Sequence, residues 1–257
     1  MKTKTMYFAV LVMMVAVVAM FTTSMPVYAS KTDDRIESSA RKSYVFKTYL
    51  SDDDIKIHSK DGVVTLTGTV LNEFHKSLAY ETVMDLPGVE SVDNRLELKS
   101  ASPTPYSDAW LSAKVTTTLL FHRSVSAAKT EVKVKDGIVT LQGVAASQAQ
   151  KDLATEYARD VEGVKDVNNE MTVVSKPAKT AKTGVGTDID DASITAQVKM
   201  TLLFHRSTST INTKVKTEKG VVTLYGKAGN AAERDLTTKL ANDINGVKSV
   251  NNKMTIE

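Results

Sequence analysis

The sequence predicts an α+β fold made of three tandem copies of a small module, each with two helices packed on one face of a three-stranded mixed sheet. Three observations support this. One motif recurs three times, and in each copy alternating apolar residues flank a turn, which is typical of a hairpin. Apolar residues at four-residue spacing precede and follow that hairpin in the sequence, which is typical of helices. The predicted order within a module is helix, strand, strand, helix, strand (αββαβ).

An eight-residue motif defines the repeat. It reads DGVVTLTG at residues 61–68, DGIVTLQG at 136–143 and KGVVTLYG at 219–226. The same spacing aligns a later glycine and an Asp-Asn or Asn-Asn pair in each copy, with no gap within the unit. Linkers rich in Ser, Thr, Pro, Lys or Gly are expected at residues 100–107 and 175–190. The modules are therefore expected at residues 33–99, 108–174 and 191–257.

The first helix of each module is expected to begin at an aspartate, because a carboxylate can accept hydrogen bonds from the free N–H groups of a helix start. The aligned aspartates are Asp33, Asp108 and Asp191. Apolar residues then follow at four-residue spacing and form one face. They are Ile36, Ala40 and Tyr44 in the first module, Leu111, Val115 and Leu119 in the second, and Ile194, Val198 and Leu202 in the third.

A tight hairpin is expected next, since Asp-Gly between two alternating runs favours a two-residue turn. A second helix follows, and an Asn or Ser can cap its first turn. The expected caps are Asn72, Ser147 and Asn230. A glycine falls just past the helix end, where a left-handed residue is common. These glycines are Gly88, Gly163 and Gly246, and the final strand of the second module is expected from Val164 to Val173.

Two further aligned sets are expected to be structural. Gly68, Gly143 and Gly226 indicate a bulge or a close helix approach, because no phosphate-loop pattern surrounds them. Asn94, Asn169 and Asn252 share the parity of the apolar residues in the final strand. An inward amide needs hydrogen bonds, so we expect these residues to tie backbone at the strand start; contact with a ligand is the alternative.

Residues 1–29 read as a secretory signal peptide. Lys2 and Lys4 precede an apolar run over residues 6–21, and small residues precede Ser30, so cleavage is expected after Ala29. An uncleaved anchor is the alternative. Cleavage leaves 228 of the 257 residues and removes two of the 33 basic residues, so that 31 basic residues face 30 acidic ones and the net charge is +1. The expected location is therefore the periplasm, with no transmembrane segment after cleavage.

Composition excludes several classes of protein. The chain has no cysteine, which excludes disulfides, thiolate metal sites, a cysteine nucleophile and an N-terminal lipid of the bacterial lipoprotein kind. A mature charge of +1 and export argue against nucleic acid as a partner. Modules of about seventy residues lie near the lower limit for folding alone without bridges, so some packing between neighbours is expected.

The repeated hairpin motif, the G-V-x-x-V-N-N segment and the helix spacing together resemble the BON domain family. The resemblance covers almost all of the chain after the signal peptide. A signal peptide followed by tandem BON modules is similar to the arrangement of osmotically inducible periplasmic proteins, which commonly carry two copies. The resemblance implies a periplasmic, non-enzymatic protein of the osmotic or envelope stress response that contacts anionic phospholipid or envelope proteins.

Seven residues are candidates for a membrane or partner surface: Trp110, Phe121, His122, Arg123, Phe204, His205 and Arg206. A Phe-His-Arg sequence ends the first helix of modules two and three, where it could form a basic, aromatic-edged patch for lipid phosphate. In the alternative, Phe packs and His-Arg follows the helix end, where cations are favoured. Trp110 lies at a helix edge, which suits a membrane interface or ordinary peripheral packing.

No catalytic residue, cofactor site or metal site is predicted, because no nucleophile with a base and no cofactor fingerprint recurs across the modules. The aspartates at residues 52–54 and 188–191 look like turns and caps, with calcium as the alternative. The leading hypothesis is a protein whose repeated surfaces gain avidity through linkers. The alternatives are a chaperone-like holdase for unfolded clients and, less expected, a hydrolase. The oligomeric state stays open.

Overall fold

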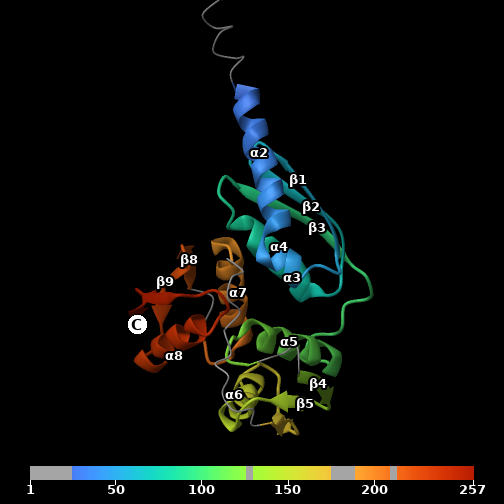
Figure 1. Cartoon of the computed structure of the whole chain (residues 1–257), viewed down its shortest axis with the longest axis vertical. Helices are drawn as coiled ribbons and strands as arrows, with labels where there is room; N and C mark the ends of the chain where they lie inside the picture. The colour runs from blue at the N-terminus through green and yellow to red at the C-terminus, as the bar shows by residue number, and fades with distance from the viewer. Residues whose placement is uncertain (1–24, 126–129, 175–188, 209–212) are drawn as a thin grey trace, which may run out of the picture.

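The computed structural model describes residues 25–125, 130–174, 189–208 and 213–257. Within these ranges the chain forms three α+β modules that lie against one another, with helix α7 (Asp191–Phe204) between the other two modules (Figure 1). Most of the predicted signal peptide and of the second linker lies outside the described residues. No helix within the described ranges has the length and apolar character needed to cross a membrane.

The first module contains a mixed sheet with the repeat motif in its centre. Strand β2 pairs antiparallel with β1 and parallel with β3, as the predicted order requires. The two-residue β1–β2 connection makes a tight hairpin, whereas the parallel pairing needs a helix as crossover. The elements are α2 (Met25–Lys42), α3 (Tyr44–Thr48), β1 (Asp54–Lys60), β2 (Val63–Val70), α4 (Glu73–Met84) and β3 (Ser91–Leu98).

The second and third modules repeat this topology. Their elements are α5 (Asp108–Phe121), β4 (Thr130–Lys135), β5 (Ile138–Ala145), α6 (Gln148–Arg159), β6 (Asp166–Asn169) and β7 (Thr172–Val173), then α7, β8 (Lys214–Glu218), β9 (Val221–Tyr225), β10 (Lys227–Ala228), α8 (Ala231–Asn242), β11 (Ser249–Asn252) and β12 (Thr255–Ile256). The predicted final strand is interrupted in both modules. At the interruption after β6, the side-chain oxygen of Asn169 accepts from the backbone N–H of Met171 at 3.0 Å.

The hairpin turns and the second-helix caps are confirmed. Both turn residues have positive φ in every module, for example 55° at Asp136 and 81° at Gly137, as a type I′ turn requires. Asn72, Ser147 and Asn230 each cap their helix with the side-chain oxygen. The later glycines, such as Gly163, lie three residues beyond the helix C-cap rather than directly after the helix end.

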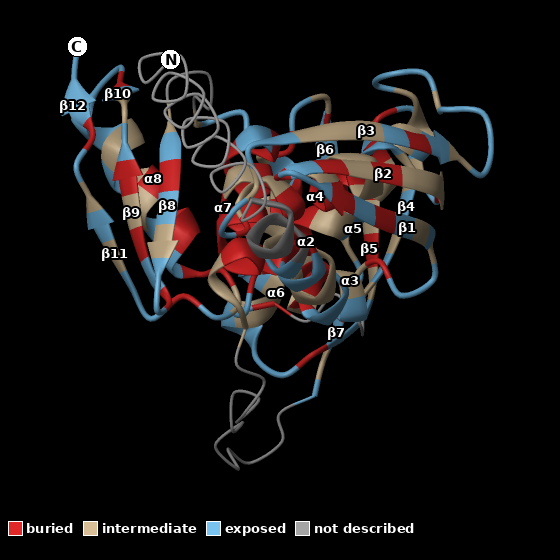
Figure 2. Cartoon of the chain, turned by 90° about the horizontal axis from the view of Figure 1, so that it is seen from above, coloured by how far each residue is buried: buried red, intermediate tan, exposed pale blue. Residues whose placement is uncertain are grey.

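Buried residues line the helix-facing side of each sheet and extend through α7 (Figure 2). The cores of modules one and three form one continuous cluster, whereas module two has its own core. Eleven of the fourteen residues of α7 are buried, including the polar Gln197 and Thr201. The predicted single apolar face of this helix is therefore too narrow a description, because its other side packs against module one.

The first helix of module one differs from the prediction. It begins at Met25 rather than at Asp33, runs to Lys42 and restarts after a break at Ser43. The break frees backbone N–H groups, and module three supplies acceptors for two of them. Asp190 Oδ2 accepts from Tyr44 N at 2.8 Å, and Ser193 Oγ accepts from Val45 N at 3.1 Å. The break is therefore satisfied by contact between the modules.

Gly68 offers a test of the sheet geometry. Its φ is 112°, and a Cβ atom there would lie 2.0 Å from the carbonyl oxygen of Asp54 on the neighbouring strand. We expect Gly68→Ala to lower the free energy of unfolding by about 2 kcal/mol or more, because the strands must separate. Urea denaturation followed by circular dichroism measures this. Gly229→Ala is the control, since only the flexible end of Glu233 approaches that position and its φ is not positive; equal losses would contradict the explanation.

Candidate functional site

The aspartates expected to cap the first helices bind the hairpin turns instead. The N-caps of α5 and α7 are Ser107 and Asp190. Asp108 is the first residue of α5, and its carboxylate accepts from the backbone N–H groups of Asp136 at 2.8 Å and Gly137 at 2.9 Å. This corrects the predicted role: the carboxylate joins the helix to the turn. The reason is geometric, because the turn amides lie opposite the helix start.

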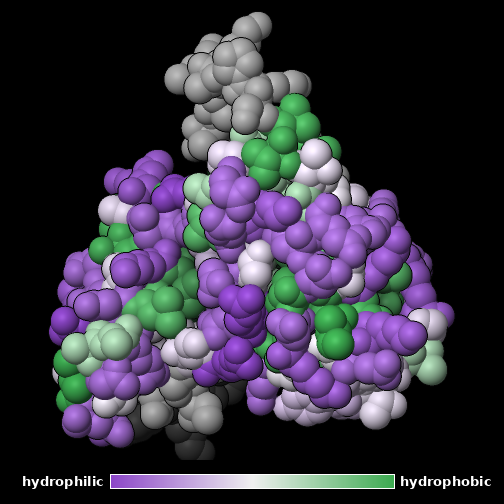
Figure 3. Space-filling model, turned by 90° about the horizontal axis from the view of Figure 1, so that it is seen from below, coloured by the Kyte–Doolittle hydropathy of each residue, from purple (hydrophilic) through white to green (hydrophobic). Residues whose placement is uncertain are grey.

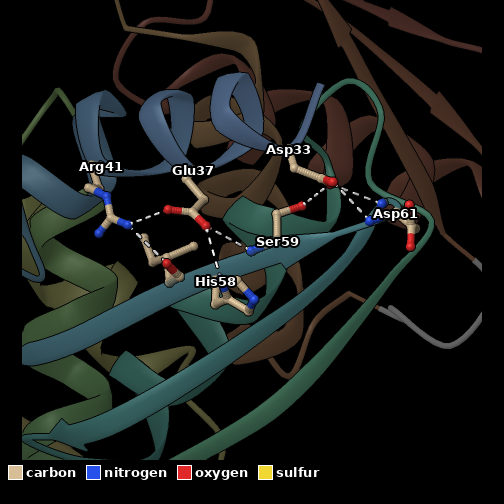
Figure 4. A network of polar contacts seen from close by, with 8 residues as sticks. Asp33, Glu37, Arg41, His58, Ser59 and Asp61 are labelled. Atoms are coloured by element: carbon tan, nitrogen blue, oxygen red, sulfur yellow. Dashed lines mark hydrogen bonds and ion pairs between the residues drawn. The ribbon is translucent and has the colours of Figure 1, made fainter. Parts of the chain in front are cut away.

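The same clamp exists in the other modules. Asp191 accepts from Lys219 N and Gly220 N, and Asp33 accepts from Asp61 N, Gly62 N and the Ser59 hydroxyl (Figure 4). The hydrogen bond from Ser59, helped by those from the turn, lowers the pKa of Asp33.

In module one, Glu37 extends this network. Its carboxylate accepts from Ser59 N at 3.0 Å and pairs with Arg41 at 2.6 Å, as Figure 4 shows. Arg41 in turn donates to the carbonyl oxygen of Ile57 at 2.9 Å. The first helix and β1 are thus joined at several points along their length.

Each clamp holds a turn whose flanking residues are exposed. We define the three hairpin tips as residues 60–63, 135–138 and 218–221. An exposed aliphatic residue begins the second strand of each tip: Val63 is 42% exposed, Ile138 45% and Val221 39%. Exposed lysines lie beside them, at Lys60, Lys135 and Lys219 within the tips and at Lys165 and Lys248 in the loops below. The three tips therefore share an exposed aliphatic residue at one aligned position and differ in the charges around it.

Modules two and three meet through a pair of buried histidines. His122 and His205 follow α5 and α7, and each is 1% exposed. Their Nε2 atoms lie 3.3 Å apart. On the other side of each ring, Nδ1 faces a carboxylate of the opposite module: Asp243 Oδ2 is 3.2 Å from His122 and Asp160 Oδ2 is 2.9 Å from His205. We refer to these four residues as the His–Asp latch.

The backbone around the latch is reciprocal as well. Arg123 N donates to Asp243 O at 2.8 Å, and the aligned Arg206 N donates to Asp160 O at 2.9 Å. Their guanidinium groups lie 3.7 Å from the same carboxylates. Such exchanged contacts between equivalent residues are typical of a twofold dimer, here formed by two modules of one chain.

Hydrogen bonding sets the charge of the latch aspartates. Burial opposes ionisation of Asp243, but hydrogen bonds from His122, Ser124 and Tyr157 lower its pKa overall. The pKa of Asp160 is lowered in the same way, by His205 and Ser207 against burial. Both carboxylates are therefore ionised at neutral pH.

Tyr157 breaks the symmetry of the latch. Its ring stacks on His122 at 3.9 Å, and its hydroxyl donates to Asp243 at 2.7 Å. The aligned residue of module three is Leu240, which lines a cavity of about 270 Å³ beside His205. The two histidines therefore lie in unequal surroundings.

Module one uses the same helix end with a different partner. Asp85 aligns with Asp160 and Asp243, and all three are the C-cap of their second helix. Asp85 accepts from Lys199 of α7 at 2.7 Å, and Glu81 accepts from the same ammonium at 3.0 Å. Burial opposes the charge of Lys199, but the two carboxylates raise its pKa overall. One aspartate per module thus contacts a cation-forming side chain of another module.

All three modules contribute to an aromatic cluster. Trp110 of module two lies 5.6 Å from the ring of Phe74 of module one, which lies 5.0 Å from Phe204 of module three. The Lys114 ammonium lies over the Trp110 ring at 4.7 Å and over Phe204 at 5.5 Å. Burial lowers the pKa of Lys114. Cation–π contacts partly offset the cost of burying this charge.

The seven surface candidates have different positions in the structure. Phe121, His122, Phe204 and His205 are buried against other modules, which corrects their expected place on a surface. These four side chains are buried because the modules dock against one another, and the sequence of one module alone does not predict that docking. Trp110 is half-buried, and Arg123 and Arg206 are exposed while bonded to the opposite module. For these three residues, contact with lipid or a partner stays a prediction.

The repeated asparagines join the final strand to the second helix. The side-chain amides of Asn94, Asn169 and Asn252 donate to carbonyl oxygens of Lys76, Lys151 and Arg234 at 3.2, 2.8 and 2.9 Å. The later glycines allow a close approach to the first helix. A Cβ at Gly246, for instance, would lie 2.9 Å from Ile189 and 3.1 Å from Ile194.

The docking aspartates Asp85, Asp160 and Asp243 are the residues that sequence reasoning missed. Their signal was present, since an aspartate occupies the same aligned position in all three modules. The described residues contain no cluster of three or more His, Asp or Glu side chains placed to hold a metal ion.

These aligned aspartates predict a ranking of stability losses. We expect Asp243→Asn to lower the free energy of unfolding by about 3 kcal/mol, because it leaves His122, Tyr157 and Ser124 with a weaker acceptor in a buried site. Asp85→Asn is expected to cost about 1 kcal/mol, because Lys199 is more exposed and keeps Glu81. Urea denaturation followed by circular dichroism compares the two variants; an equal or reversed order would contradict the ranking.

Known proteins share the repeat. The BON domain family matches residues 32–100, 107–175 and 190–257, which is most of the chain. Osmotically-inducible protein Y of Escherichia coli is 33% identical over 147 residues, covering 57% of this chain and 71% of that protein. The outer membrane lipoprotein DolP of Haemophilus influenzae is 33% identical over 117 residues, covering 45% of this chain and 56% of that protein. A 21 kDa hemolysin of Actinobacillus pleuropneumoniae is 32% identical over 123 residues, covering 48% and 60%. With three matched copies of one module, the chain belongs to the BON domain family.

Proposed function

We propose that this protein is a non-enzymatic envelope protein of the osmotic or envelope stress response, and that it binds anionic phospholipid surfaces through its hairpin tips. The observation that carries the proposal is the repeated tip: an exposed Val or Ile occupies one aligned position in all three modules, and each tip also contains an exposed lysine. An aliphatic side chain can enter the membrane interface while a nearby ammonium meets lipid phosphate.

The relatives support the envelope setting. One is named for osmotic induction and another as an outer membrane lipoprotein. Export by residues 1–29 to the periplasm is part of the proposal, because a lipid-binding role requires access to a membrane surface. Association is expected to be peripheral and reversible.

The tips are unequal in charge. Module one has Glu90 where modules two and three have Lys165 and Lys248 in the loop below the tip. Elsewhere the surface is mainly hydrophilic, with apolar residues in separate patches on the face that Figure 3 shows. We therefore infer that the tips of modules two and three contribute most of the binding.

Docking of the modules changes the expected mechanism of avidity. The sequence predicted avidity through linkers, with some packing between neighbouring modules; the described modules contact one another through the latch and α7. Tips held on one assembly lose less orientational freedom on binding than tips on separate modules. In this proposal, avidity comes from fixed spacing.

Vesicle co-sedimentation of the chain from Ser30 onward tests the proposal. We expect binding to vesicles with anionic lipid at low salt, weaker binding at high salt, and little binding to neutral vesicles. The double substitution Ile138→Ser with Val221→Ser should weaken binding about tenfold, because two interfacial aliphatic groups are lost.

The control is Leu153→Ser with Leu203→Ser, which removes two exposed leucines of the same modules outside the tips. Equal weakening by both pairs would exclude the tips as the contact. Absence of binding to anionic vesicles at low salt would exclude the lipid function. Suppression of the aggregation of an unfolded client without lipid would then favour the holdase.

A further inference from the structure

With neutral histidines and ionised aspartates, the His–Asp latch has too few N–H donors for the acceptor atoms that face one another. A neutral imidazole carries one N–H, and an ionised carboxylate only accepts. If Nδ1 of His122 and His205 each donates to its aspartate, both Nε2 atoms are acceptors that face each other at 3.3 Å. If one ring instead carries its hydrogen on Nε2, its bare Nδ1 faces a carboxylate. Either arrangement opposes two lone pairs, so one more hydrogen is needed.

We propose that His122 and His205 share one additional proton between their Nε2 atoms, and that this proton makes docking of modules two and three dependent on pH. One shared hydrogen turns the 3.3 Å contact into a hydrogen bond and gives the two rings together a single positive charge. A second added proton would point two cationic Nε2–H groups at each other. Loss of the shared proton would oppose two lone pairs. Docking is therefore strongest in an intermediate range of pH and weaker on both sides.

The surroundings of the latch support one added proton rather than two. The carboxylates of Asp160 and Asp243 and the guanidinium groups of Arg123 and Arg206 face the pair. Two carboxylates and two guanidinium groups balance, so one added proton gives the site a single positive charge, whereas a second would place two positive charges on rings whose Nε2 atoms lie 3.3 Å apart. Tyr157 faces His122 and donates to Asp243, while Glu156 and Arg159 line the neighbouring cavity and pair with each other.

Docking of modules two and three is expected to weaken as the pH falls, because of the pKa of His122. Burial lowers the pKa of His122, with Asp243 opposing and His205 adding to the effect. A histidine whose pKa is lower in the docked state binds more protons once released, so acid favours release. This loss begins as the pH falls below about 6.5, the ordinary histidine value. Asp160 and Asp243 have lowered pKa values and stay ionised over that range.

The direct measurement is NMR of imidazole nitrogens in the purified protein, with small-angle X-ray scattering over the same range of pH. At neutral pH we expect one ring pair with a single shared Nε2 hydrogen, strongly shifted downfield, and a compact particle. As the pH falls below about 6, both rings should become cationic while the radius of gyration increases. Two neutral rings at neutral pH, or two cationic rings in an unchanged particle, would overturn the proposal.

Variants separate the latch from the other histidines. His122→Gln with His205→Gln keeps a polar contact without titration, so the acid expansion should be lost. The matched control is His58→Gln with His75→Gln, which replaces the two histidines of module one and should leave the expansion unchanged. Expansion that follows the control pair would also overturn the proposal. The NMR result on the unsubstituted protein decides the case if the first pair fails to fold.

Discussion

The arrangement of the three modules depends on one constraint: a carboxylate at the end of the second helix needs a partner when it is wholly or partly buried. In each module this C-cap aspartate finds its partner in another module, either a histidine or Lys199. Leaving such a group unpaired would cost several kcal/mol, whereas pairing it fixes which surfaces meet. The repeated aspartate thereby determines which module surfaces dock against each other and contributes to the strength of that contact.

Helix α7 is the clearest result of this docking. It serves as the first helix of module three, and it also completes the core of module one and satisfies the backbone break at Ser43. Modules one and three consequently share a single hydrophobic cluster. A module of about seventy residues has little core of its own, and sharing a helix enlarges the core without disulfides.

The sequence predicted what recurs with local periodicity and missed what depends on contacts between modules. The type I′ turns at Asp136-Gly137 and the caps at Asn72, Ser147 and Asn230 follow from local backbone chemistry, so they could be predicted. The buried state of His122 and His205 could not, because no local pattern states which module lies opposite. Asp108 was misassigned for a related reason: its partners lie 28 and 29 residues away in the chain.

The carboxylate clamp on the hairpin turn has a consequence for how the tips can vary. The clamp binds only backbone N–H groups at the turn, so it does not depend on which side chain stands there, and the chain indeed has Asp61, Asp136 and Lys219 at this position. Backbone N–H groups thus hold the shape of the turn, whereas the exposed side chains of the tip are available to contact a ligand. Among residues that tolerate the positive φ of this position, substitution can change charge or ligand preference while the turn keeps its shape, so the first turn position can diversify between modules whereas the glycine after it is retained.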